Sequence, residues 1–87
     1  MKSPNMHTIA AKLSYTQRHA LRCAERDGVL IEPELYLECD AGGLTIHNIR
    51  RGVDLLVAKG LLRVDEYGDK VITDMGRAAL GLASARL

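Results

Sequence analysis

Residues 44–64 of this chain read LTIHNIRRGVDLLVAKGLLRV, and residues 65–82 continue with DEYGDKVITDMGRAALGL. In the first part, apolar residues recur at steps of three and four, which is typical of an amphipathic helix. In the second part, short apolar runs flank a polar stretch that contains a glycine, which favours a tight hairpin. Together they predict a helix, a small hairpin and a second helix.

The first of these helices is predicted over residues 46–59. Thr45 suits the N-cap, because its hydroxyl can accept a hydrogen bond from an otherwise free amide of the first turn. Gly60 stands where a left-handed residue commonly ends a helix, and Leu61 can fold back onto Leu56. The buried stripe is predicted to consist of Ile46, Ile49, Val53 and Leu56. This register turns the polar side chains of the helix outward.

The hairpin is predicted from strand-forming residues on both sides of the turn at residues 66–69. These strand formers are Leu62, Val64, Val71 and Ile72. Thr73 is expected to cap a last helix over residues 74–84, with Asp74 in the first turn favoured by the helix dipole.

This order of elements resembles the winged helix-turn-helix of MarR-like transcriptional regulators. In that family the junction before the last helix commonly reads Leu-Thr-x-x-Gly-Arg, and residues 72–77 here read ITDMGR. A Leu-x-x-x-Gly-Leu segment precedes it at residues 56–61. The resemblance covers residues 13–82 and implies an α+β fold that is mostly α. This fold has three core helices, a small two- to three-stranded wing sheet and a C-terminal helix.

The resemblance also implies a small sequence-specific DNA-binding regulator of bacterial or phage type, which reads the major groove with helix 46–59. On that helix the candidate DNA-binding residues are Thr45, His47, Asn48, Arg50 and Arg51. Arginine can make bidentate contacts to guanine or grip phosphate, and asparagine suits adenine. Two alternatives stay open. Arg50 can form an ion pair with Asp54, which lies four residues later on the helix, and His47 and Asn48 can be solvent-exposed residues that bind nothing.

Two further candidates lie on the predicted wing. Arg63 at its base and Lys70 on its return strand are expected to reach flanking phosphate. Against this, Asp65, Glu66 and Asp69 crowd the wing tip, where carboxylates would repel a phosphate backbone.

The charge of the chain leaves a second function open. Twelve basic residues against eleven acidic ones give a net charge of only +1, less than many DNA-binding domains carry. Residues 27–43 contain acidic side chains but neither lysine nor arginine. The alternative is therefore a winged-helix scaffold that binds another protein, for example a phage-encoded inhibitor or adaptor, through its acidic second helix and wing. Tyr67 at the wing tip suits such an interface.

Length and composition indicate a single domain over residues 1–87, with residues 1–6 expected to fray. No apolar run approaches the roughly 20 residues of a membrane helix, and the first residues have no apolar signal region. We therefore expect a cytoplasmic protein. A nucleophile motif, a phosphate-binding glycine loop and a paired-carboxylate pocket are all missing from the sequence, so we expect neither an enzyme nor a cofactor.

The N-terminal half is predicted to supply the remaining elements. Residues 14–17 match a capping box, which starts a helix over residues 15–26. Residues 29–31 are short, β-branched and apolar, as expected for a first strand beside the wing. Residues 33–40 can form either a brief helix with Pro33 in its first turn or a strand.

His19 and Cys23 lie four residues apart and can share a metal ion, with Cys39 as the obvious third ligand. Buried free cysteine is the commoner state, so no metal site is expected.

A homodimer through the chain ends is predicted from the wide apolar surface of the last helix. The residues concerned are Met75, Gly76, Ala78, Ala79, Leu80, Gly81, Leu82 and Ala83, together with Ile9 and Ala10.

Overall fold

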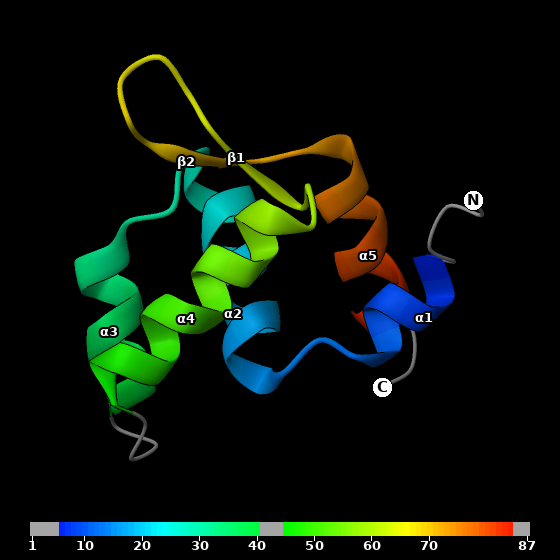
Figure 1. Ribbon diagram of the computed structural model, residues 1–87, viewed down its shortest axis with the longest axis horizontal. Coiled ribbons are helices and arrows are strands. Elements are labelled where there is room, and N and C mark those ends of the chain that lie inside the picture. Colours follow the sequence, from blue (N-terminus) through cyan, green and yellow to red (C-terminus); the bar gives the residue numbers. More distant parts are fainter. Residues whose placement is uncertain (1–5, 41–44, 85–87) are drawn as a thin grey trace.

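The computed structural model describes residues 6–40 and 45–84 of the chain. Its elements are α1 (Met6–Ala11), α2 (Tyr15–Asp27), α3 (Glu32–Asp40), α4 (Ile46–Ala58), β1 (Leu62–Val64), β2 (Lys70–Ile72) and α5 (Asp74–Ser84) (Figure 1). The protein is thus mostly helical, with a small antiparallel sheet and a C-terminal helix. None of the described helices is long and apolar enough to cross a membrane. Of the residues expected to fray, 1–5 lie outside the described part, whereas Met6 begins α1.

Helix α2 lies at the centre of the core and contacts α3, α4, α5 and β2. Its fully buried residues are Ala20, Leu21 and Ala24. The helix starts with the predicted capping box. The Ser14 hydroxyl accepts a hydrogen bond from the Gln17 backbone N–H at 3.1 Å, and the Gln17 side chain accepts one from the Ser14 N–H at 3.0 Å. At its end Gly28 adopts a left-handed conformation, with φ of 79°.

Residues 33–40 belong to a helix and not to a strand, the other conformation that their sequence allows. Leu35 and Cys39 are buried one turn apart, whereas Leu37 between them is 76% exposed. In a strand all three would point to the same face, because side chains alternate. In a helix positions i and i+4 share a face and i+2 points away, as observed. Pro33 lies in the first turn, where its missing N–H costs no hydrogen bond.

Helix α4 confirms most of its predicted register. Three of the four predicted stripe residues are buried: Ile49, Val53 and Leu56. The prediction for Ile46 is wrong, since this side chain is 53% exposed. It lies in the first turn, outside the core, and borders Tyr36 and Leu37 at the surface. Gly60, with φ of 80°, ends the helix, and the Leu61 N–H donates to the Leu56 carbonyl at 2.9 Å, as in a Schellman motif.

Strands β1 and β2 form an antiparallel hairpin in which Arg63 lies opposite Val71. Its turn is closed by Asp65, whose Oδ1 accepts hydrogen bonds from the backbone N–H groups of Tyr67 and Asp69, both at 2.9 Å. Gly68 supplies the left-handed residue of this turn, with φ of 82°. The local sequence therefore places the reversal where it was predicted.

The predicted first strand at residues 29–31 is not formed. Only one ladder-like hydrogen bond is made, from the Leu30 N–H to the Lys70 carbonyl at 2.8 Å. The chain bends at residues 28 and 29 and enters α3 at Glu32, so the Leu30 N–H alone reaches β2 among the described hydrogen bonds of this segment. The sheet therefore has two strands in the described part of the chain.

Helix α5 has the bounds predicted for it, and Thr73 caps it: the Thr73 hydroxyl accepts a hydrogen bond from the Gly76 N–H at 3.0 Å. Helix α1 packs against α5 (Figure 1). Ile9 and Ala10 are buried within this chain. They do not form the exposed dimerisation surface that the sequence suggested.

Candidate nucleic-acid interface

The outward face of α4 carries the side chains predicted to read DNA. All five are exposed: Thr45, His47, Asn48, Arg50 and Arg51. Their direction is fixed because the opposite face of the helix is anchored in the core. The Thr45 hydroxyl also accepts a hydrogen bond from the Asn48 backbone N–H at 3.2 Å, which fixes the first turn. His47, Arg50, Arg51 and Asp54 border one shallow surface depression together with Ile46.

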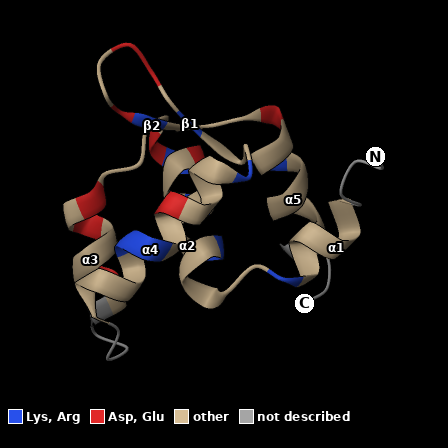
Figure 2. Ribbon diagram, in the orientation of Figure 1, with Lys and Arg blue, Asp and Glu red and all other residues tan. Residues whose placement is uncertain are grey.

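Some cations of the protein have carboxylate partners among the described residues, whereas others, including the arginines of this face, do not. Arg26 pairs with Asp27 at 3.1 Å, and Arg77 pairs with Glu25 at 2.9 Å. Within residues 6–40 and 45–84, by contrast, no carboxylate forms an ion pair with Arg50, Arg51 or Arg63. Arg50 therefore does not make the i+4 pair with Asp54 that the sequence left open. Figure 2 shows the basic part of α4 beside the acidic start of α3.

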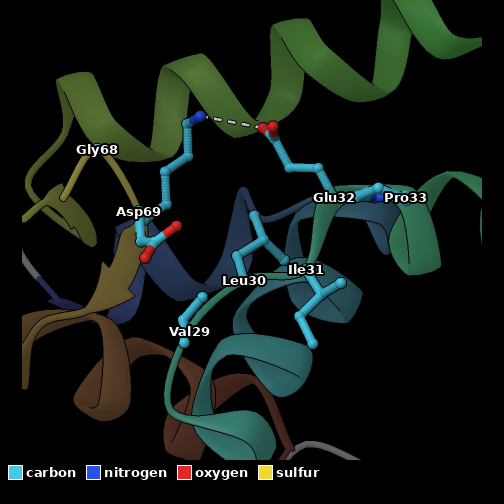
Figure 3. A pocket seen from close by; sticks show the side chains of 8 residues that line it. Val29, Leu30, Ile31, Glu32, Pro33, Gly68 and Asp69 are labelled. Atoms are coloured by element: carbon cyan, nitrogen blue, oxygen red, sulfur yellow. Dashed lines mark hydrogen bonds and ion pairs between the residues drawn. The ribbon is translucent and has the colours of Figure 1, made fainter.

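The structure separates the two basic residues of the hairpin. Arg63 on β1 is exposed. Lys70 on β2 is instead half-buried, and its Nζ donates to Glu32 Oε1 at 3.0 Å, the contact drawn as a dashed line in Figure 3. The phosphate contact expected of Lys70 stays a prediction. In this structure its ammonium group joins the hairpin to the start of α3. The pair joins residues 38 positions apart, a contact that no local sequence pattern indicates.

The tip of the hairpin is acidic, as predicted, but its carboxylates are not equivalent. Asp65 is used inside the turn, where two backbone N–H groups donate to it. Glu66 and Asp69 are exposed, and Tyr67 between them is 81% exposed. The tip therefore presents negative charge and one aromatic ring to solvent.

An apolar surface next to the basic face was not predicted. We call it the α3–α4 apolar patch, and it consists of Pro33, Tyr36, Leu37 and Ile46. Burial is the main cause that raises the pKa of the Tyr36 hydroxyl, and neighbouring Arg50 acts in the opposite direction. Tyr36 is therefore neutral near pH 7 and adds no negative charge beside that arginine. The sequence did not reveal this patch, because Ile46 fits the predicted buried stripe of the following helix and residues 33–40 could form either a helix or a strand.

The chain matches no protein-family model, and no curated protein or solved structure matched it either.

Proposed function

We propose that this protein is a small DNA-binding transcriptional regulator with a winged helix-turn-helix fold, and not an enzyme. Helices α3 and α4 act as the helix-turn-helix, and the β1–β2 hairpin acts as the wing. One observation carries the proposal: Arg50 and Arg51 lie together on the exposed face of α4, whose opposite face is buried in the core and which leads directly into the β1–β2 hairpin. Exposed guanidinium groups of this kind are available to duplex DNA.

The chemistry of the α4 face suits base reading. A helix fits the major groove of B-DNA, and its first turns usually approach the base edges. Arg50 and Arg51 offer bidentate donors to guanine or phosphate, and Asn48 offers the amide that pairs with adenine. Thr45 and His47 stand at the N-terminal end of the same face, and Arg63 can add a phosphate contact from the hairpin. As a DNA-binding protein it would act in the cytoplasm of a bacterium.

The proposed DNA-binding unit is a homodimer, since two copies would read two half-sites and offset the low charge of one chain. Burial within one chain limits which side chains of α5 are available to such a dimer. On α5, Ala79 is buried and Met75, Leu80 and Leu82 are half-buried against the core. Ala78 and Gly81 remain exposed, whereas the side chain of Ala83 lies outside the described part. An interface on α5 is therefore centred on Ala78 and Gly81.

Binding to random duplex DNA at low salt tests the proposal. The double variant Arg50→Ala/Arg51→Ala should lose most of the affinity, because binding to random DNA depends on cations that contact phosphate and this change removes both from the α4 face. The matched control, Arg26→Ala/Arg77→Ala, removes the same charge from residues that already have partners, and it should bind nearly as well as the unmodified protein. Equal affinity of both double variants, with intact circular dichroism spectra, would rule out α4 as the reading helix.

A second candidate function is favoured by the exposed apolar side chains. Leu37 of the α3–α4 apolar patch and Tyr67 of the hairpin tip are the most exposed large apolar residues described. Exposed aromatic and aliphatic side chains beside acidic groups suit capture of another protein. In this alternative the chain is an inhibitor or adaptor, and duplex DNA would not bind at any salt concentration.

A further inference from the structure

Helices α2 and α3 bring three potential metal ligands together. His19 and Cys23 lie one turn apart on α2, and Glu38 approaches them from α3. One ligand atom from each side chain can be chosen so that all three lie within 4.8 Å of one another. The sequence indicated the first two residues, but it suggested Cys39 as the third. Cys39 is buried in the core, and its neighbour Glu38 takes that place.

The contacts within this cluster all converge on one carboxylate oxygen. Glu38 Oε2 contacts His19 Nε2, and the Cys23 thiol donates to the same oxygen at 3.7 Å. The contact with His19 is the main cause that lowers the pKa of the Glu38 carboxyl, so this group is ionised near neutral pH. Burial raises the pKa of the Cys23 thiol, with Glu38 adding to the effect. A cation that binds here must therefore displace the thiol proton.

We propose that His19, Cys23 and Glu38 form a binding site for a borderline-soft divalent cation, with Zn²⁺ as the best match. Imidazole nitrogen, thiolate sulfur and carboxylate oxygen are the three donor types that zinc accepts in proteins. Magnesium and calcium prefer oxygen donors alone, so the sulfur and nitrogen select against them. The proposal concerns binding only and does not depend on the proposed DNA-binding function.

One of the ligand spacings already fits a small metal site, whereas the direct contact between His19 Nε2 and Glu38 Oε2 must open to admit a cation. Zinc–ligand bonds of about 2.0–2.3 Å in a tetrahedron place ligand atoms roughly 3.3–3.8 Å apart. The 3.7 Å between Cys23 Sγ and Glu38 Oε2 already falls in this range. The side chains of His19 and Glu38 are 22% and 42% exposed, so solvent can supply the fourth ligand. Because the ligands come from two helices, the bound cation joins α2 to α3.

Cobalt provides the direct test. The metal-free, reduced protein should be titrated with Co²⁺, which reports a bound thiolate through a charge-transfer absorption band. We expect one equivalent per chain, loss of the band when Zn²⁺ is added, and a higher melting temperature with Zn²⁺ than without it. The absence of a saturable band, or a stoichiometry other than one per chain, would overturn the proposal.

Variants identify the ligands. Cys23→Ser, His19→Gln and Glu38→Gln should each abolish or strongly weaken the cobalt band, while the metal-free proteins keep their helical spectra. Glu34→Gln on the same helix is the matched control for Glu38, and Cys39→Ser is the control for Cys23; both should keep the band. Cys23 is buried, so the surface variant Glu38→Gln decides the question if Cys23→Ser does not fold. A full band in Glu38→Gln would contradict the assigned site.

Discussion

Gly76 packs directly against the backbone of Leu61, so closely that a Cβ at position 76 would lie 2.1 Å from the Leu61 carbonyl oxygen. This contact seats the first turn of α5 against the segment between α4 and β1. It also explains the glycine of the ITDMGR sequence without invoking a partner protomer, because the close approach occurs within one chain. In a packed interior, displacing either the Leu61 carbonyl or the first turn of α5 would cost free energy, because neighbouring atoms would have to move as well.

Gly76→Ala should therefore destabilise the protein by about 3 kcal/mol, the upper part of the range for overpacking. The control is Gly52→Ala in α4, where the one neighbour within 4 Å of an added Cβ is Gln17 Cγ, at an ordinary contact distance of 3.5 Å. It should stabilise the protein by up to about 1 kcal/mol, the difference in helix propensity between alanine and glycine. Urea denaturation of both variants measures the two effects. Equal stabilities would contradict the close contact.

Two basic residues of the hairpin should respond differently to the same substitution. Lys70→Met should lower the free energy of unfolding by about 1 kcal/mol, because Glu32 loses its partner. Arg63→Met should leave stability within about 0.5 kcal/mol. If Arg63 touches phosphate, its loss should reduce the salt slope of DNA binding by about 1. Thermal melts measure the stability of both variants, and salt titrations measure their DNA binding. Equal changes in both quantities for the two variants would contradict the prediction that Lys70 stabilises the fold and Arg63 contacts phosphate.

Neutralising the hairpin tip separates the two candidate functions. In a DNA-binding protein, Glu66→Gln/Asp69→Asn should strengthen duplex binding, because unscreened repulsion of phosphate extends about 8–10 Å at moderate salt. Asp65 is left unchanged, since its carboxylate holds the turn. In a protein-binding adaptor, the same change should weaken partner capture by removing complementary charge. Titration with duplex DNA at two salt concentrations decides the matter, and no binding by either protein would favour the adaptor.

The proposed homodimer makes a further prediction about mass. Light scattering at micromolar concentration should give twice the 9.5 kDa of one chain. Ala78→Glu places a charge on the exposed side of α5 and should return the protein to a monomer with an unchanged circular dichroism spectrum. A monomeric unmodified protein would exclude a stable dimer, and a dimeric Ala78→Glu variant would move the interface away from α5.

The sequence alone determined where most elements begin and end. The Ser14 capping box, the Thr45 and Thr73 caps and the left-handed glycines Gly60 and Gly68 all lie where they were predicted. These signals are reliable because each acts between residues only a few positions apart. A cap hydroxyl and the amide it accepts from are neighbours in the chain, whatever the rest of the fold does.

Only the tertiary structure decided how the side chains are used. It exposed Ile46, which the helical period assigned to the core, and it paired Lys70 with Glu32. It also brought Glu38, and not Cys39, to His19 on the neighbouring helix. The exposure of Ile46, the Lys70–Glu32 pair and the approach of Glu38 to His19 all depend on how helices and strands pack. In each case the residues that meet, or fail to meet, are far apart in the sequence. Periodicity fixes the face on which a side chain lies, but packing determines what that face meets.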